Sequence, residues 1–280
     1  MRSSRDGRRR DRPAAAGRSA SDGGTRSPGT SRVLAIDLGG SGTRAWVCGG
    51  ALLGAGSVSH DSASRPVRRG RIVDPESCAV LLARVADTAL GADRRDSVIV
   101  LSRPVLAGLE HRAQARELLA RLGPSSGMVL SSAEAAAACA GPAGSGPVLV
   151  VDMGAELTEV ALLVDGVTRD ARQADSGLTD LDPDALPAQL AGAVVDMIAC
   201  MWREDRHGAV RGALRRGPVL TGGGALRSDV TGLIAARLGA AVRVDPDPST
   251  AVVRGAALLA GRVPAGTRPG PAPAVPARRR

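Results

Sequence analysis

Residues 33–47 read VLAIDLGGSGTRAWV, and residues 148–162 repeat the pattern as VLVVDMGAELTEVAL at a constant offset of 115 positions. Each copy starts with an apolar run typical of a buried strand, places an Asp at its end, turns at Gly and returns through a Thr into a second strand. A P-loop or a dinucleotide fold would pass from such a Gly-rich loop directly into a helix. The sequence therefore predicts two duplicated hairpins that face each other across a cleft.

The net charge of +9 is concentrated at the two ends of this 280-residue chain. Residues 1–31 and 262–280 are rich in Arg, and the residues between them are close to neutral. Such segments bury too little apolar surface to offset the entropy of ordering, so we expect a disordered basic arm at 1–31 and a disordered Pro/Arg tail at 262–280. With no Tyr, no Phe and two Trp, the chain lacks aromatic surfaces on which single-stranded nucleic acids stack, and no specific nucleic-acid partner is expected.

Between these ends, apolar periodicity and chain breakers predict alternating strands and helices. Asp74 and Pro75 mark the start of an amphipathic helix, as N-cap and first helical residue. Further strands are expected at 97–101, 128–130, 218–221 and 242–244, and further helices at 110–122, 131–139, 185–202, 226–238 and 249–260. Residues 51–70 are predicted to be irregular, and residues 165–184 are predicted to be polar and turn-rich. The Gly/Pro-rich segment 141–147 is typical of a linker, so we expect one half at 32–140 and the other at 148–261.

A third Gly-rich motif, LTGGGAL at 220–226, follows another expected strand. Together with the two hairpins, the segment RPVRRGRIVD at 65–74 and the closing pattern from Asp245 to Ala256, it comes in the order and spacing of the actin, Hsp70 and sugar kinase superfamily. Over residues 32–261 the chain most resembles the bacterial actin homologues MreB and Mbl, the rod-shape-determining proteins. The resemblance implies an α/β, actin-like ATPase fold with two duplicated ribonuclease-H-like halves around a nucleotide cleft.

The resemblance also implies a site for ATP and Mg²⁺ in that cleft. The backbone N–H groups of the first Gly-rich loop can point at phosphate, because glycines allow close approach. Asp37 and Asp152, at strand ends on opposite sides of the cleft, are placed to hold a hydrated Mg²⁺. The expected cofactor-binding residues are Asp37, Gly39, Gly40, Ser41, Gly42, Thr43, Asp152, Gly154, Thr158, Gly222, Gly223 and Gly224.

Two departures from the family pattern bear on this site. The second hairpin has Ala155 and Glu156 where the family has glycines, so side chains and a like charge stand where the backbone would approach a phosphate. Ser132 takes the place of the family's water-positioning Glu, and a hydroxyl cannot act as a carboxylate base. Glu134 is the one weak candidate for that catalytic role, although Ser131 and Glu134 also form the pattern of a capping box, which we favour.

A third departure is one of length. Actin-like members insert an outer subdomain into each half, but only residues 51–74 and 165–184 are available here, too few for two separately packed subdomains. We therefore expect the outer subdomains to be largely missing.

The expected function is that of an MreB/Mbl-like protein in cell-shape or cell-wall organisation, which binds ATP weakly and is at most a slow ATPase. Self-association into filaments is expected of such a cytoplasmic protein, as is contact with the inner face of the cell membrane or with the cell-wall machinery. Two alternatives stay open: a non-catalytic scaffold that has lost nucleotide binding, and a small-molecule kinase of the same superfamily. A kinase would need a catalytic Asp near its substrate pocket and a substrate-binding insertion, and the sequence shows room for neither.

Overall fold

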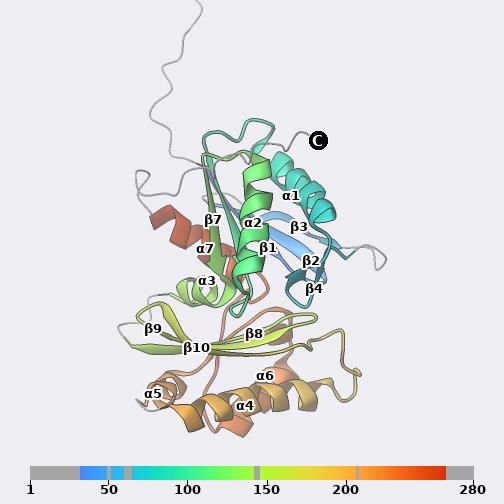
Figure 1. Cartoon of the computed structure of the whole chain (residues 1–280). Coiled ribbons are helices and arrows are strands. Elements are labelled where there is room, and N and C mark those ends of the chain that lie inside the picture. Colours follow the sequence, from blue (N-terminus) through green and yellow to red (C-terminus); the bar gives the residue numbers. More distant parts are fainter. Residues whose placement is uncertain (1–31, 49–51, 60–64, 142–145, 206–207, 263–280) are drawn as a thin grey trace, which may run out of the picture. The chain divides into compact units, whose positions relative to one another are not determined.

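Two five-stranded sheets of identical strand order form the framework of the chain (Figure 1). The computed structural model describes residues 32–48, 52–59, 65–141, 146–205 and 208–262, with the backbone alone at 52–59. The predicted basic arm, and the predicted tail beyond residue 262, lie outside these ranges. No helix in the described part of the chain is long and apolar enough to cross a membrane.

Each sheet combines an antiparallel hairpin with parallel strands. The first sheet has the order β3-β2-β1-β6-β7, and the second has the order β10-β9-β8-β11-β12. The strands of the first are β1 (Arg32–Leu38), β2 (Gly42–Val47), β3 (Leu52–Ser59), β6 (Ser97–Arg103) and β7 (Ser126–Ser131). Those of the second are β8 (Pro147–Met153), β9 (Thr158–Val164), β10 (Val167–Ala174), β11 (Val219–Thr221) and β12 (Arg243–Val244). Corresponding strands occupy corresponding places, so the predicted duplication and α/β fold class are confirmed.

The turns of the two hairpins are also built alike. The Gly39 N–H donates to the Gly42 carbonyl at 3.0 Å, and the Gly154 N–H donates to the Leu157 carbonyl at 2.9 Å. A Cβ added at either Gly39 or Gly154 would lie 2.9 Å from that same carbonyl oxygen, closer than real Cβ contacts come. Glycine is therefore required at the equivalent position of both turns.

The expectations of an irregular segment at 51–70 and of a turn-rich segment at 165–184 are wrong in part, because each range contains the third strand of a sheet. β3 reads LLGAGSVS and β10 reads VTRDARQA, and neither carries the β-branched run that marks a strand in sequence. Both are outermost strands, paired antiparallel with β2 or β9 on one side only. Strand formation there depends on a neighbour already in place, which local sequence does not reveal.

Helices cover the sheets in layers (Figure 1). The apolar residues of α1 (Pro75–Leu90) and α2 (Leu109–Leu122) pack on the outer face of the first sheet. Those of α4 (Leu186–Glu204), α5 (Ala209–Arg216) and α6 (Ser228–Leu238) pack on the outer face of the second. Two helices, α3 (Ser132–Cys139) and α7 (Ala251–Arg262), share one core with strands of both sheets and form the layer between them.

Strand periodicity assigns each side chain to one of these layers. In β1, Val33 and Ala35 face the central helices, whereas Leu34 and Ile36 face α1 and α2. The smaller side chains thus point toward the central layer and the larger ones toward the outer layers. The Ala-rich sequences of α3 and α7 complete this arrangement, since small residues let two helices and two sheets pack closely.

The central helices come from distant parts of the chain. α7 is the last described helix, yet it contacts β1, β2 and β6 of the first sheet as well as α3. A Cβ at Gly255 of α7 would overlap the backbone carbonyl of Ala135 in α3, so the two helix axes approach as closely as glycine permits. The boundary between halves at 141–147 remains a prediction. It does not account for α7, which follows the second sheet in sequence but packs against the first.

The segments where outer subdomains would be inserted are short. Between β3 and α1, the described residues hold the two-stranded sheet of β4 (Val67–Arg68) and β5 (Arg71–Ile72). Between β10 and α4 there is no helix or strand. At the start of α1, the Asp74 carboxylate accepts a hydrogen bond from the Ser77 N–H at 3.0 Å, as expected for its N-cap.

Candidate functional site

The turns that follow β1 and β8 line one cavity of about 250 Å³. The Gly-rich segment after β11 joins them as a 3₁₀ turn (Gly223–Leu226), so that all three sequence motifs meet there. Eight of the expected residues line the cavity: Asp37, Gly39, Gly40, Ser41, Asp152, Gly154, Gly222 and Gly223. The motifs are far apart in sequence, and the sheet order brings them together.

The other four expected residues, Gly42, Thr43, Thr158 and Gly224, are not among those that line it. Thr43 and Thr158 are buried, and the Thr158 hydroxyl donates to the Ser176 carbonyl at 2.9 Å. A Cβ at Gly224 would lie 2.6 Å from the Met153 Cβ, so this glycine allows close packing beneath the site. These residues support the turns instead of forming the cavity wall.

Gly222 lets the third motif approach Asp152. Its φ of +81° lies in the region that favours glycine, and a Cβ there would overlap both the Asp152 carboxylate and the Met153 carbonyl. The Gly222 N–H donates to the Pro248 carbonyl at 2.9 Å, which fixes the segment. The glycine therefore serves backbone geometry and places the third motif against the carboxylate.

Asp37 and Asp152 provide negative charge in the cavity. The Ser102 hydroxyl donates to Asp37 Oδ1 and holds that side chain in position. Burial, and after it the charge of Asp37, raises the pKa of Asp152 to about 6, whereas the Thr221 hydroxyl and Arg44 act in the opposite direction. A cation between Asp37 and Asp152 would favour the charged form of Asp152, so the two carboxylates form a site that a cation would stabilise.

A third acid, Glu159, lines the same cavity and was missed from the sequence. Its side chain is 5% exposed; Oε1 accepts a hydrogen bond from the Val105 N–H at 2.7 Å and Oε2 accepts one from the Ser132 hydroxyl at 3.1 Å. Burial, and after it the charge of Asp152, raises the pKa of Glu159 to about 8. Glu159 is the cross-strand partner of Asp152, and counting that register along the hairpin could have identified it.

Arg44 is the second residue that the sequence reasoning missed. It is the cross-strand partner of Asp37 in the first hairpin, and it lines the cavity beside Ser41. A guanidinium in this position supplies positive charge next to the first Gly-rich turn. The same register count could have identified it.

The capping-box interpretation of Ser131 and Glu134 is wrong. Ser131 has the extended backbone of an N-cap, but its buried hydroxyl makes no hydrogen bond with any described residue. The Glu134 carboxylate instead accepts a hydrogen bond from Thr168 in β10 at 3.4 Å, because α3 lies against the second sheet. Glu134 is also not among the residues that line the cavity, so the structure gives its catalytic candidacy no support.

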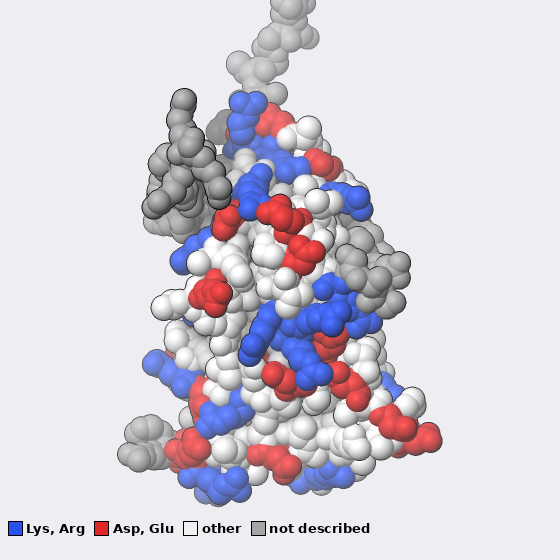
Figure 2. All heavy atoms as spheres, turned by 45° about the vertical axis from the view of Figure 1, so that its right-hand side comes forward, with Lys and Arg blue, Asp and Glu red and all other residues white. Residues whose placement is uncertain are grey.

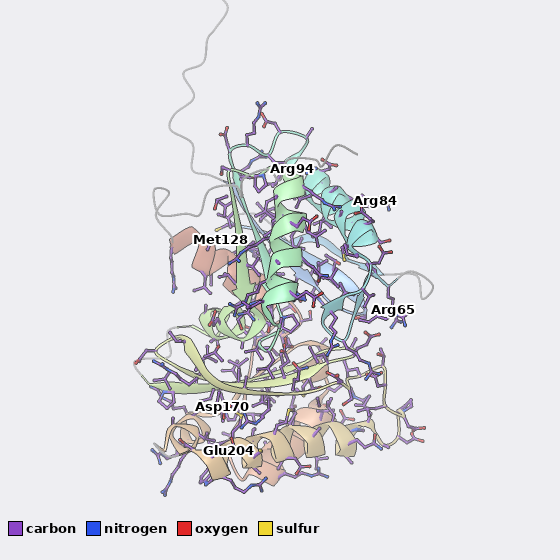
Figure 3. The ribbon with its side chains drawn as sticks, in the orientation of Figure 1. Arg65, Arg84, Arg94, Met128, Asp170 and Glu204 are labelled. Carbon is purple, nitrogen blue, oxygen red and sulfur yellow. The ribbon has the colours of Figure 1, made fainter. Side chains whose placement is uncertain are left out.

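Glu156 joins the second hairpin to the segment around β4. Its carboxylate accepts hydrogen bonds from Arg65 Nη1 at 2.8 Å and from the Arg69 N–H at 3.0 Å. In Figure 3, Arg65 lies where the elements around the first sheet meet the second sheet. The Glu156 side chain thus has a defined place in the cavity wall.

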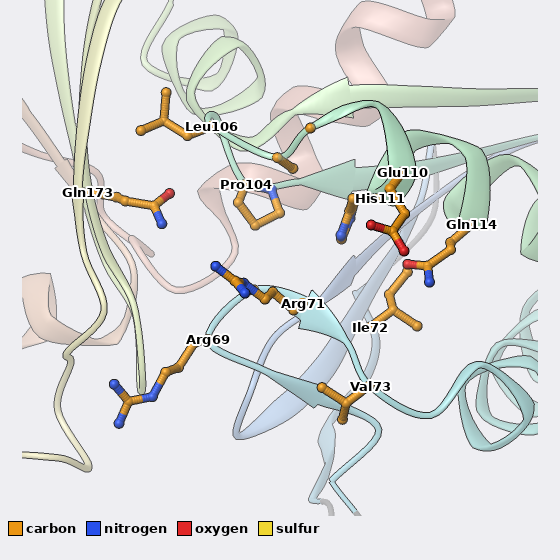
Figure 4. Close-up of a pocket in the computed structure, with 13 residues that line it drawn as sticks. Arg69, Arg71, Ile72, Val73, Pro104, Leu106, Glu110, His111, Gln114 and Gln173 are labelled. Atoms are coloured by element: carbon orange, nitrogen blue, oxygen red, sulfur yellow. The ribbon is translucent and has the colours of Figure 1, made fainter.

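A neighbouring cavity of about 380 Å³ shares Gly70 and Pro104 with the first (Figure 4). Arg71 points into it, with Pro104 and His111 on one side and Gln173 of β10 on the other. Burial, and after it the charge of Arg103, lowers the pKa of His111, which favours the neutral imidazole. None of the twelve residues expected to bind the cofactor lines this second cavity.

Comparison with known proteins gives a consistent picture of the fold. No protein-family model and no curated protein matches the sequence. Among solved structures, MreB5 of Spiroplasma citri bound to ADP is similar, with a TM-score of 0.68 and 14% identity over 81% of this chain and 95% of that one. The MamK double helical filament gives a TM-score of 0.71 and 16% identity over 83% and 99%.

A third similar structure is the ethanolamine utilization protein EutJ from Carboxydothermus hydrogenoformans, with a TM-score of 0.52 and 17% identity over 80% of this chain and 88% of that one. Identities this low establish the fold alone. The fold implied by the sequence resemblance is confirmed: the chain has the actin-like ATPase fold.

Proposed function

We propose that this chain is an actin-like protein that binds a Mg²⁺–adenine nucleotide in the cavity between its two hairpin turns and works in cell-shape or cell-wall organisation. The observation that carries the proposal is the convergence of Asp37, Asp152 and the three Gly-rich motifs on one cavity. Nucleotide binding would act mainly by shifting the population between open and closed arrangements of the two halves. Such a shift needs no fast chemistry.

The donor set fits Mg²⁺. In the part of the chain that the structure describes, no group of three or more His, Cys, Asp or Glu side chains is arranged to hold a metal ion. Mg²⁺ commonly keeps several waters and takes one or two carboxylates together with ligand phosphates. Asp37 and Asp152 would supply those carboxylates, and the ion would supply positive charge for the phosphates.

The backbone fits a nucleotide. Gly39, Gly154 and Gly222 line the cavity without a side chain, so a ligand could come close to the main chain there. Arg44 adds a positive charge on the first turn, where phosphate oxygens would accept its hydrogen bonds. The relatives named above include one bound to ADP, and this chain's nucleotide is inferred by analogy with it.

Hydrolysis is proposed to be slow or absent. Ser132 occupies the position where the family resemblance implies a water-positioning Glu, and its hydroxyl donates to Glu159. The raised pKa of Glu159 keeps its carboxyl protonated near neutral pH, which makes it a poor acceptor of a proton from water.

Thermal unfolding in the presence of Mg·ADP and Mg·ATP tests the binding proposal. A ligand that binds only the folded state adds RT ln(1 + [L]/Kd), or about 2.7 kcal/mol at 100 times Kd. Wild type should gain stability, Asp37→Ala should gain much less, and the exposed Asp96→Ala should behave as wild type. Absence of stabilisation by either nucleotide at millimolar concentration would eliminate the proposal and leave the scaffold alternative, which the position of Glu156 favours.

Self-association belongs to the same proposal, since one structural neighbour is a double helical filament. We propose that the protein works in the cytoplasm, in part at the inner face of the membrane. Sedimentation with and without Mg·ADP or Mg·ATP should show nucleotide-dependent pelleting. A monomer under all these conditions would contradict the cytoskeletal role without touching the nucleotide proposal.

A further inference from the structure

Glu156 is a carboxylate side chain that lines the proposed nucleotide cavity. Its side chain is 13% exposed, so the carboxylate is largely removed from water. Both oxygens are used: Oε1 accepts from Arg65 Nη1 at 2.8 Å and Oε2 accepts from the Arg69 N–H at 3.0 Å. A carboxylate with two such donors is fixed in place.

The carboxylate lies directly against the first Gly-rich turn. A Cβ built at Gly40 would come within 2.6 Å of Glu156 Oε2, so only the missing side chain of Gly40 leaves room for it. Glu156 therefore occupies the space next to the backbone that the proposed function assigns to phosphate. A ligand oxygen in that space would meet both the atoms and the negative charge of the carboxylate.

Further contacts hold the segment that carries the donors. Arg69 donates through its guanidinium to the Asp175 carbonyl and to the Asp180 carboxylate, the latter at 3.2 Å. Figure 2 shows basic side chains gathered directly above acidic ones near the middle of the face that it draws. Arg69, which donates to Glu156, is thus also held by Asp175 and Asp180, in the segment between β10 and α4.

The size of the cavity points in the same direction. Its volume of about 250 Å³ is below the roughly 300–1,000 Å³ usual for small-molecule sites. Each additional phosphate brings volume and negative charge, and Glu156 opposes both where it lines the cavity beside the first Gly-rich turn. A ligand with a shorter phosphate chain meets less of this opposition.

We propose that Glu156 determines the phosphate-chain specificity of the cavity, which accepts a nucleoside diphosphate in preference to a nucleoside triphosphate. The proposal rests on the proposed nucleotide binding and adds which nucleotide is bound. The terminal phosphate of a triphosphate would have to displace Glu156 from Arg65 and Arg69, whereas a diphosphate leaves both hydrogen bonds in place.

The test compares the Kd values of Mg·ADP and Mg·ATP for the full chain and two variants. Glu156→Gln removes the charge at nearly constant volume. Glu117→Gln is the matched control, since it makes the same substitution at a carboxylate that is 67% exposed in α2 and does not line the cavity. Wild type and Glu117→Gln should bind ADP about tenfold or more tightly than ATP, because the charge of Glu156 repels the additional phosphate. In Glu156→Gln the ratio should fall to within about threefold, mainly through tighter binding of ATP.

The ratio of the two affinities separates specificity from a general effect on folding, which would change both values together. An unchanged ratio in Glu156→Gln, or a preference of wild type for ATP, would overturn the assignment of Glu156 and leave the nucleotide proposal standing. If neither nucleotide binds to any of the three proteins, the nucleotide proposal itself is refuted, and the role of Glu156 with it.

Discussion

Arg44 and Glu159 occupy equivalent positions of the two hairpins, and both line the same cavity. Each is the cross-strand partner of the Asp in its own hairpin, Arg44 opposite Asp37 and Glu159 opposite Asp152. The duplicated backbone therefore presents a cation from one side of the cavity and a buried acid from the other. The two sides are alike in geometry and unlike in charge.

Replacing Arg44 by Gln should weaken nucleotide binding. The guanidinium is the charged donor next to the first Gly-rich turn, and hydrogen bonds to charged groups contribute about 1.5–3 kcal/mol, so the Kd should rise by about tenfold or more. The exposed Arg84→Gln in α1 is the control and should leave Kd unchanged. Titration calorimetry with Mg·ADP measures both, and an Arg44→Gln Kd within twofold of wild type would contradict this role.

Glu159 should make the protein less stable as pH rises. Its pKa is raised from 4.5 in the unfolded chain to about 8 in the folded protein, so the folded state keeps a proton that the unfolded state loses over this range. The free energy of unfolding should fall by roughly a few kcal/mol between pH 4.5 and 8. Asp152 contributes in the same direction up to its pKa of about 6. Urea unfolding across this pH range measures the slope.

The matched variant Glu159→Gln isolates the contribution of this acid. The amide can still accept from the Val105 N–H and pair with the Ser132 hydroxyl, but it does not titrate. Its stability should be nearly constant from pH 6 to 8, where wild type continues to lose stability. The exposed Glu110→Gln should follow wild type, and an identical slope in Glu159→Gln and wild type would refute the assignment.

The Arg65–Glu156 pair should contribute measurably to folding stability even without ligand. The side chains are 28% and 13% exposed, whereas those of the Arg121–Glu117 pair in α2 are 41% and 67% exposed. A double-mutant cycle with Arg65→Gln and Glu156→Gln should give a coupling of about 1–3 kcal/mol. The same cycle at Arg121 and Glu117 should give about 0.3–0.5 kcal/mol, because solvent screens an exposed pair. Equal couplings at the two sites would show that the cavity pair is no more than a surface contact.

Gly255→Ala should destabilise the central helix layer. The added Cβ would overlap the Ala135 carbonyl, and a backbone atom cannot move aside without separating α3 from α7. The expected loss is about 1–3 kcal/mol, typical of overpacking in a close-packed interior. Gly261→Ala, in the same helix with open space around it, should be neutral or stabilising by up to about 1 kcal/mol. Denaturant unfolding measures the free energy of unfolding of both variants. Equal values would show that α3 and α7 tolerate a wider spacing.

The sequence by itself determined the repeated hairpin, the Gly-rich turns and the two aspartates, because these follow from local chemistry. An apolar run, an Asp at its end and a glycine where Cβ would touch a carbonyl specify the same turn twice. The resemblance carried by the three Gly-rich motifs implied the actin-like fold, and eight of the twelve residues expected to bind the cofactor line the cavity.

Only the tertiary structure decided what depends on segments that are distant in sequence. It added the edge strands β3 and β10, which form because a neighbouring strand offers hydrogen bonds, and it brought α7 back onto the first sheet. It also brought Glu159 to Ser132 and Glu156 to Arg65, and it showed that Thr43 and Thr158 support their turns from within the core. Charges and hydrogen-bond donors act through space, so their partners are set by how the sheets and helices pack.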